Sequence, residues 1–203
     1  MSHLKPVKGE SQVVYRNKYS YVYSQKVDFG SFSKEYFVTH FGEKAGVLVV
    51  KDDTLLLVRQ YRLLIDGLSY EIPAGKVDEG EDPKITAIRE CEEETGIRCR
   101  NLVSLLDFQY SLESVYSPNH LFYTKDFDVV RAFSPSPEEV LAVDWVKIPR
   151  CLRMIEDGEI ADIFSILALL YYCYKVAEPL KAEKMATQNH CRNYKLRRTG
   201  NWK

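Results

Sequence analysis

The sequence predicts an α/β (α+β) fold in which a mixed β-sheet is sandwiched between helices. Runs rich in valine, tyrosine and phenylalanine fill residues 11–50, a composition typical of strands. A helix with clear start and stop signals follows near residues 82–96, and the region 151–178 is helical again. The order of strands, helix, strands and helices favours a mixed sheet with helices packed on it.

Composition limits the classes of function. The chain has 203 residues, which fits one large domain or a domain with a small appendage. A formal net charge of -1 favours neither nucleic acid nor an anionic membrane as a partner. The start of the chain does not resemble a signal peptide, and the apolar run from Ile166 is too short to span a bilayer. Five scattered cysteines without a C-x-x-C pair favour a reducing, cytoplasmic location.

The first part of the chain is predicted to form an antiparallel strand segment followed by a hairpin. Asn17-Lys18 and Gly30-Ser31 are turn candidates, and the polar residues 51–53 are predicted to form the hairpin turn. Pro73 and Gly75 are expected to stop the last of these strands. The expected strands cover residues 13–29 (with a turn inside), 34–41, 45–50, 55–62 and 69–77.

The first helix has recognisable ends. Asp82 is expected to be the N-cap and Pro83 the first helical residue, where its missing N–H costs nothing. The helix is expected to run to about Thr95, with Gly96 as its stop. Further strands are expected at 102–110, 120–127 and 140–148, a proline-broken acidic loop at 133–139, and helices at 151–158 and 161–178.

The sequence RECEEETG places four carboxylates on the last turn of this helix, where the helix dipole and like charges make acids unfavourable. Glu90 and Glu94 share one face, with Glu93 beside them. Arg89 can pair with Glu93, whereas Glu92 points away and is expected to be solvated. Oxygen ligands gathered on one face suit Mg²⁺ or Mn²⁺. The alternative is a solvated acidic helix face.

The residues around this cluster have the spacing of a known motif. Five residues separate Gly75 from Glu81, and seven more precede Arg89, which matches the Nudix box G-x5-E-x7-R-E-U-x-E-E-x-G-U, where U is a bulky apolar residue. Cys91 is the one departure, and a buried cysteine behaves as a small hydrophobe. Over about residues 12–177 the chain resembles the ADP-ribose and nucleoside-diphosphate-sugar pyrophosphatases of the Nudix superfamily. The resembling stretches are LLLVRQYR, YEIPAGKVDEGE, SPSPEE and IEDGEIAD.

The resemblance implies a Nudix-type fold and a divalent-metal site. In such enzymes the box helix binds two or three ions, carried over here to Glu90 and Glu94, with Glu93 assisting as a ligand and catalytic residue. The backbone carbonyl of Ala74 would add a ligand, and Gly75 would let its loop approach the helix closely. Mg²⁺ or Mn²⁺ would polarise a phosphoryl oxygen and activate water.

Substrate contacts are implied on the strands before the box. Arg62 corresponds to the arginine of the family's Q-x-R and would bind a phosphate oxygen; Arg59 could do the same from the other face of its strand. Each could instead be an ordinary surface arginine. Glu71 resembles a glutamate that helps to hold substrate or metal. Glu81 is expected to be structural, fixing the loop to the helix.

Two loops beyond the box are expected to complete the site. Family members often take a general base from a glutamate in a mobile loop, which is Glu139 by slight preference, or Glu138; either could be a solvated loop acid. Leu112 stands where ADP-ribose enzymes usually carry a proline, so other nucleotide sugars become candidates. Glu113 could replace the family's ribose-binding glutamate, or Pro118 could mark a shifted loop.

Three segments are expected: residues 1–42, a strand segment for dimerisation and for the substrate pocket; 43–177, the Nudix hydrolase domain; and 178–203, a basic tail. The resemblance implies a homodimer. The tail has seven Lys/Arg and two Glu, which is compatible with a flexible segment or with weak RNA binding.

Aromatic side chains in the first segment could stack on a base or simply pack the sheet. They are Tyr19, Tyr21, Tyr23, Phe29 and Phe32.

The predicted activity is metal-dependent hydrolysis of the pyrophosphate bond of a nucleoside diphosphate sugar, such as ADP-ribose, to a nucleoside monophosphate and a sugar phosphate. One alternative is a catalytically silent nucleotide-sensing module, because a fold alone does not guarantee activity. Another is hydrolysis of a different nucleoside diphosphate derivative, such as coenzyme A. Neither a membrane nor nucleic acid is expected as a partner.

Overall fold

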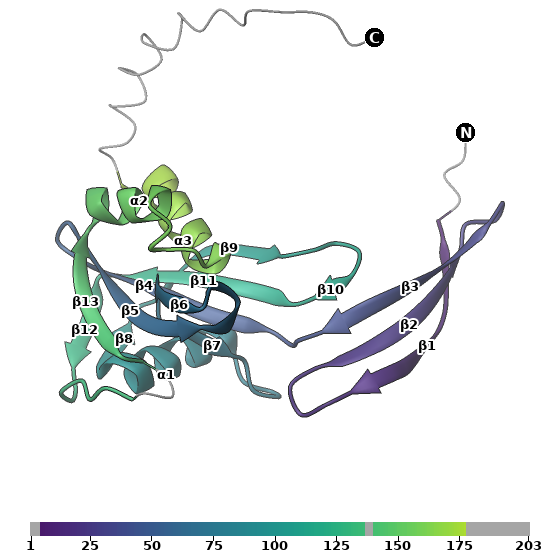
Figure 1. The fold of residues 1–203 in the computed structure, drawn as a ribbon, viewed down its shortest axis with the longest axis horizontal. Coiled ribbons are helices and arrows are strands. Elements are labelled where there is room, and N and C mark those ends of the chain that lie inside the picture. The colour runs from purple at the N-terminus through teal and green to yellow at the C-terminus, as the bar shows by residue number, and fades with distance from the viewer. Residues whose placement is uncertain (1–4, 137–139, 178–203) are drawn as a thin grey trace, which may run out of the picture.

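A computed structural model describes residues 5–136 and 140–177 (Figure 1). The strands are β1 (Val7–Arg16), β2 (Tyr21–Asp28), β3 (Ser33–His40), β4 (Lys44–Lys51), β5 (Thr54–Arg62), β6 (Gly67–Glu71), β7 (Ala74–Lys76), β8 (Ile97–Arg100), β9 (Val103–Gln109), β10 (Val115–Tyr116), β11 (Pro118–Thr124), β12 (Asp126–Val129) and β13 (Ala142–Lys147). The helices are α1 (Pro83–Thr95), α2 (Ile148–Glu156) and α3 (Ile163–Lys175), with a 3-10 turn, η1 (Leu63–Ile65).

A seven-stranded mixed sheet forms the centre of the molecule. Its main order is β13-β5-β4-β11-β9, with β6 paired to β5 and β7 to β4. β4 and β11 run parallel, whereas the other pairs in this sheet are antiparallel. β8 and β12 form a separate two-stranded sheet. The predicted mixed sheet is therefore confirmed.

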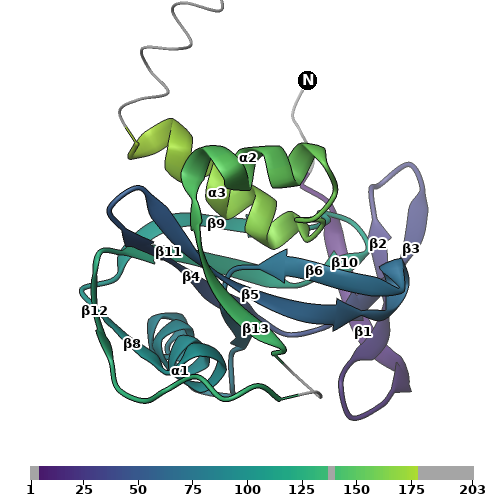
Figure 2. The same cartoon turned by 60° about the vertical axis from the view of Figure 1, so that its left-hand side comes forward.

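Helices cover both faces of this sheet (Figure 2). β4 alternates between them: Leu48 belongs to the core cluster that includes residues of α2 and α3, whereas Val47 and Val49 belong to the cluster around Ala87 and Cys91 of α1. This alternation follows from the two-residue period of a strand. The predicted sandwich of sheet between helices is confirmed. No helix within the described part of the chain is long and apolar enough to cross a membrane.

The ends of α1 agree with the sequence prediction. The Asp82 side chain accepts a hydrogen bond from the Lys84 N–H at 2.7 Å, and Pro83 occupies the first turn. Gly96 ends the helix in the left-handed region at φ 74°, which glycine adopts without a steric cost. The acidic residues therefore do lie on the last turn of α1.

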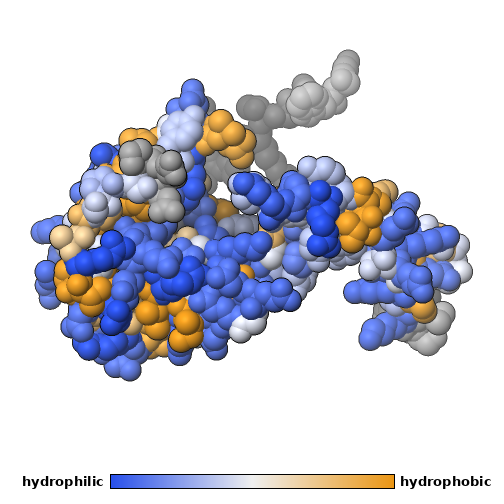
Figure 3. Space-filling model, turned by 90° about the horizontal axis from the view of Figure 1, so that it is seen from below, coloured by the Kyte–Doolittle hydropathy of each residue, from blue (hydrophilic) through white to orange (hydrophobic). Residues whose placement is uncertain are grey.

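A second sheet of order β1-β2-β3-β10 projects from the central sheet as an arm (Figures 1 and 3). β1 is exposed along its whole length. At the base of the arm the His40 ring is stacked between Tyr21 and Tyr116, with both centroid distances 4.5 Å. The parallel pairing of β3 with β10 ties the arm to the loop that precedes β11.

Some elements differ from the sequence prediction. The expected strand 69–77 breaks between β6 and β7, because the Ile72 N–H donates to the Ser165 hydroxyl at 3.0 Å instead of to a neighbouring strand. Ser165 in turn donates to Asp162, the N-cap of α3. The short strands β8 and β10 were not predicted, and the strand expected at 120–127 divides after Thr124 into β11 and β12. α2 begins at Ile148, before the expected start at Cys151.

Candidate functional site

The last turn of α1 lies against β7, and this contact defines the candidate site. Gly75 of β7 is so close to the helix that a Cβ atom there would lie 2.0 Å from the Glu90 carboxyl carbon. Glu94 accepts hydrogen bonds from the Ala74 N–H and from the Gln60 side-chain amide, each at 3.2 Å. Glu90 and Glu94 are therefore held near the backbone that precedes the helix.

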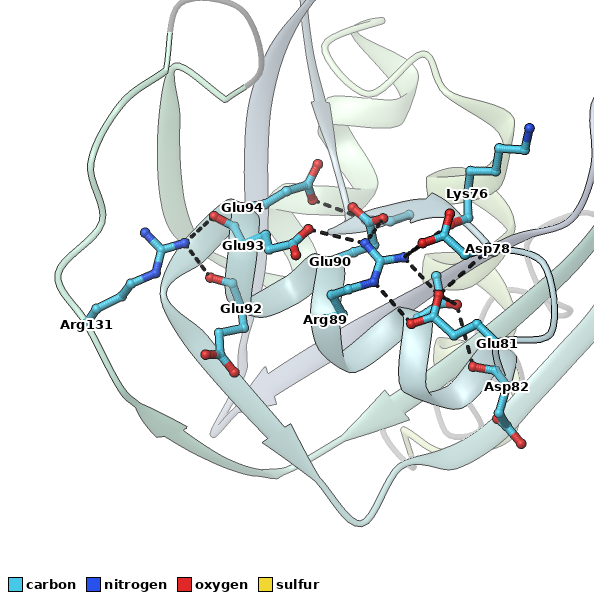
Figure 4. A network of polar contacts seen from close by, with 12 residues as sticks. Lys76, Asp78, Glu81, Asp82, Arg89, Glu90, Glu92, Glu93, Glu94 and Arg131 are labelled. Atoms are coloured by element: carbon cyan, nitrogen blue, oxygen red, sulfur yellow. Dashed lines mark hydrogen bonds and ion pairs between the residues drawn. The ribbon is translucent and has the colours of Figure 1, made fainter. Parts of the chain in front are cut away.

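Arg89 connects the acidic residues to the loop before the helix (Figure 4). Its guanidinium contacts Glu81 at 2.9 and 3.1 Å, Glu90 at 2.7 Å and Glu93 at 3.2 Å, and it also donates to the Lys76 carbonyl. The expected Arg89–Glu93 pair is present. Arg89 holds the pKa of Glu81 down at about 2. These contacts fix the loop and the orientation of two of the carboxylates.

Glu92 was predicted to be solvated, but in the structure it forms an ion pair. Arg98 of β8 contacts its two carboxylate oxygens at 2.6 and 2.9 Å. The chain reverses at Gly96, which brings β8 back past the end of the helix. Glu92 is thus neutralised on the side of the helix away from Glu90 and Glu94.

Glu90 and Glu94 are electrostatically strained in the protein without a metal. Burial raises the pKa of Glu94 to about 8, and the neighbouring Glu90 carboxylate adds to this shift. Burial also raises the pKa of Glu90. The hydrogen-bond partners of Glu94 are neutral amides, although Lys44, which lies over the Phe164 ring, partly opposes the shift. A nearby cation would stabilise the charged form of both residues.

The two candidate phosphate-binding arginines lie in different environments. Arg62 makes a two-pronged ion pair with the buried Glu71, at 2.6 and 2.5 Å. Arg59 lies 5.7 Å from the ring centroid of Tyr70, and its Nε is a buried atom without a hydrogen-bond partner among the described residues. Glu71 therefore orients Arg62, while Arg59 retains an unsatisfied donor.

The other candidate residues lie apart from the acidic turn. Glu113 pairs with Lys34 of the arm at 2.5 Å, and Leu112 is 97% exposed. Both line a cavity of about 680 Å³ between the arm and residues 109–116, and neither Glu90 nor Glu94 lines it. Within one chain, this cavity is separate from the acidic pair.

Two further sets of candidates can be placed in part. Glu138 and Glu139 lie outside the described residues, as does the tail 178–203. Backbone hydrogen bonds hold the described segments on both sides of the acidic loop. The Arg131 N–H donates to the Gly96 carbonyl, and the Leu141 N–H donates to the Arg59 carbonyl.

Among the aromatic candidates of the arm, Phe29 and Phe32 stack on each other with ring centroids 4.7 Å apart.

Sequence reasoning missed three residues that contact the site. Gln60 reaches Glu94 from β5, Ser165 holds the bend before β7, and Arg131 donates to carbonyls at the end of α1. Gln60 carried a weak signal, because it belongs to the Q-x-R segment. The other two contacts join residues 93 and 39 positions apart, and no local pattern marks them.

Comparison with known proteins decides the family. Residues 40–163 match the NUDIX domain family. The chain belongs to the NUDIX family. It is 32% identical over 165 residues to an ADP-ribose pyrophosphatase of Bacillus subtilis (strain 168), covering 81% of this chain and 88% of that protein. It is also 32% identical over 143 residues to a methanol dehydrogenase activator of Bacillus methanolicus, covering 70% and 77%.

Further relatives agree with this assignment. A GDP-mannose pyrophosphatase of Klebsiella pneumoniae is 30% identical over 126 residues, covering 58% of this chain and 63% of that protein. A crystal structure of an ADP compounds hydrolase superposes with a TM-score of 0.72 at 19% identity, covering 95% of this chain and 99% of that one. The predicted resemblance to NUDIX enzymes of the ADP-ribose pyrophosphatase type, and the predicted fold class, are confirmed.

NUDIX hydrolases generally depend on a divalent metal ion, and the donor set here fits one. Two half-buried carboxylates with raised pKa values, Glu90 and Glu94, lie next to the backbone of β7. Within the part of the chain that the structure describes, no three acidic, histidine or cysteine side chains converge as a complete protein shell. Mg²⁺ is commonly bound by one or two carboxylates, with water and substrate phosphate completing its shell.

The pKa of Glu94 predicts a stability change in the metal-free protein. Glu94 ionises near 4.5 when unfolded but at about 8 when folded, so unfolding releases its proton between these values. The free energy of unfolding should therefore fall as pH rises from 5 to 8, by up to about 1.4 kcal/mol per pH unit. Thermal unfolding of wild type and Glu94→Gln in a chelator would isolate this contribution, because the neutral amide does not titrate.

At pH 8, millimolar Mg²⁺ is expected to restore the stability that ionised Glu94 removes. It should raise the thermal midpoint of the wild type, and it should raise that of Glu94→Gln much less. Equal pH slopes for the two proteins would contradict the raised pKa of Glu94, and no response of the wild type to Mg²⁺ would contradict the interpretation of Glu94 as a cation ligand.

Proposed function

We propose that this chain is a metal-dependent pyrophosphohydrolase that cleaves a nucleoside diphosphate sugar, ADP-ribose or a related compound, into a nucleoside monophosphate and a sugar phosphate. The observation that carries the proposal is the pair of desolvated carboxylates, Glu90 and Glu94, held against Gly75. The ADP-ribose and GDP-mannose pyrophosphatases among the relatives support the substrate class.

The residues of the acidic turn take distinct roles in this proposal. Glu90 and Glu94, with the Ala74 carbonyl and with Glu93 assisting, hold Mg²⁺ or Mn²⁺. When bound, the metal polarises a phosphoryl oxygen and lowers the pKa of a coordinated water. Arg89 keeps Glu90 and Glu93 oriented through its ion pairs. Preorganised charge of this kind needs little rearrangement during the reaction.

Substrate binding and proton transfer are assigned to residues outside α1. Arg62, oriented by Glu71, binds a phosphate oxygen, because a guanidinium matches phosphate geometry. Arg59 is the second candidate for a phosphate contact; its Nε–H has no partner among the described residues but is buried, so the side chain must reorient to reach the substrate. Glu139, or else Glu138, accepts the proton of the attacking water.

The sugar end of the substrate is assigned to the cavity beside the arm of the partner subunit in a dimer, because within one chain this cavity is separate from the acidic pair. Glu113 and the exposed Leu112 both line this cavity, and Leu112 is at the position where ADP-ribose enzymes usually have proline. An exposed leucine here offers apolar contact instead of a rigid turn. Sugars other than ribose are therefore included in the proposed substrate class.

The proposal is tested by hydrolysis assays with Mg²⁺ on ADP-ribose, ADP-glucose, GDP-mannose, UDP-glucose and coenzyme A. We expect turnover of at least one nucleotide sugar to a nucleoside monophosphate and a sugar phosphate. Turnover of coenzyme A alone would reassign the substrate class. Binding of these compounds without any turnover would identify a catalytically silent nucleotide sensor.

We also propose that the protein forms a homodimer through the arm. β1 is an exposed edge strand, and the arm exposes large apolar side chains, including Val13, Tyr15 and Phe37. An unpaired edge beside exposed apolar side chains is a surface on which a second chain can pair. Sedimentation equilibrium should give twice the chain mass, and a monomer at micromolar concentration would refute the dimer.

A cytoplasmic location is proposed as well, since the four cysteines among the described residues are free and buried.

A further inference from the structure

Arg131, which follows β12, contacts the end of α1 but lies outside the Nudix box, residues 75–97. Its Nη2 donates to the backbone carbonyls of Glu92 at 2.9 Å and Glu93 at 2.5 Å (Figure 4). The backbone N–H groups of Val130 and Arg131 donate to the Gly96 carbonyl at 3.0 and 3.3 Å. The segment after β12 is therefore bound to the helix end by both backbone and side chain.

The fit between this segment and the helix end is close. A Cβ atom at Gly96 would lie 2.4 Å from the Arg131 carbonyl oxygen. Glycine at this position therefore provides both the left-handed turn and the space that Arg131 occupies. The last turn of α1 is held between β7 on one side and the Arg131 segment on another.

Arg131 neutralises a different part of the helix from the neighbouring arginines. The last carbonyls of a helix lack intrahelical partners and form the negative end of its dipole. Two other arginines contact carboxylates at this end. Arg89 pairs with Glu90 and Glu93, and Arg98 pairs with Glu92. Arg131 instead donates to the Glu93 carbonyl and to the Glu92 carbonyl, which also accepts the Gly96 N–H, so it lowers the negative potential without occupying a carboxylate.

We propose that Arg131 is a positioning residue for the metal ligands of the proposed pyrophosphohydrolase. It acts through the backbone of the last turn, holding Glu93 and Glu94 at a fixed rotation about the helix axis. The inference rests on the proposed function, because it concerns how the same acidic turn binds a divalent ion. Residues that orient metal ligands commonly change metal affinity by about tenfold or more when replaced.

The test is direct Mn²⁺ binding to chelator-treated protein, followed by the loss of the electron paramagnetic resonance signal of free Mn²⁺. Arg131→Met should raise the dissociation constant about tenfold, and Arg131→Lys, which can still donate to a carbonyl, should raise it less. Arg98→Met is the matched control, because it removes the same charge beside the same helix end without touching a carbonyl. It should change binding by less than about twofold.

The outcomes separate positioning from mere stabilisation. If Arg131→Met lowers the thermal midpoint but binds Mn²⁺ as tightly as the wild type, or more tightly, Arg131 is a helix cap only and the inference is overturned. If Arg131→Met does not fold, Arg131→Gln replaces it, and unchanged binding by this variant overturns the inference equally. Hydrolysis by the wild type decides the proposed function separately, since Mn²⁺ binding requires no turnover.

Discussion

Glu94→Gln is expected to lower kcat for nucleotide-sugar hydrolysis by about a thousandfold or more, since metal-assisted charge stabilisation contributes several kcal/mol to such reactions. Glutamine keeps the size of the side chain and can still accept a hydrogen bond from the Ala74 N–H, which glutamate accepts at 3.2 Å. It removes the negative charge, which the raised pKa of Glu94 shows to be poorly compensated by the protein. Steady-state assays at saturating Mg²⁺ measure the effect.

Glu92→Gln provides a matched control on the same turn of α1. The chemical change is identical, but the Glu92 carboxylate pairs with Arg98 on the other side of the helix. We expect its kcat to stay within about twofold of the wild type, because exposed ion pairs contribute little. Equal losses in the two variants would mean that the net charge of the helix end matters, and that Glu94 is not a specific ligand.

Gly75→Ala is expected to reduce activity at least tenfold but to destabilise the protein by only about 1 kcal/mol, the low end of the range for overpacking, because a side-chain end can move to relieve the clash. The new methyl group would lie 2.0 Å from the Glu90 carboxyl carbon and 2.1 Å from one of its oxygens. The Glu90 carboxylate, the end of a flexible side chain, must move away from β7, and it is a proposed metal ligand. Activity and thermal unfolding should be measured on the same preparation.

Gly67→Ala is the control for this substitution. Gly67 lies in β6 of the same sheet, and a Cβ atom there would meet its nearest neighbour, the Ile65 carbonyl oxygen, at 3.5 Å. That distance is an ordinary contact, so activity should be retained. Full activity of Gly75→Ala would show that the close approach of β7 to α1 is not needed for catalysis.

The sequence was most informative where local rules apply. The caps of α1 and the shared face of Glu90 and Glu94 depend on helical geometry, which operates within a few residues. The Glu92–Arg98 pair escaped prediction because it spans the turn at Gly96, beyond which helical periodicity no longer applies. The fold class was predictable because the order of elements limits how layers can pack.

Contacts between distant segments were not predictable in the same way. The hydrogen bond from Ile72, the residue after β6, to Ser165 of α3 ends the strand that local composition predicted to continue. Arg131 reaches α1 only because β12 pairs with β8. A serine and an arginine are common surface residues, so their types carry no signal until the fold places them.

The separation of the arm from the central sheet affects how this protein could diversify. The arm has its own sheet, joined to the rest by the β3–β10 pairing and the stacked His40. Leu112 and Glu113 line the cavity beside the arm, away from Gly75 and α1. Under the proposed assignment of the sugar to that cavity, substitutions around it could exchange one sugar preference for another while the acidic turn is inherited unchanged.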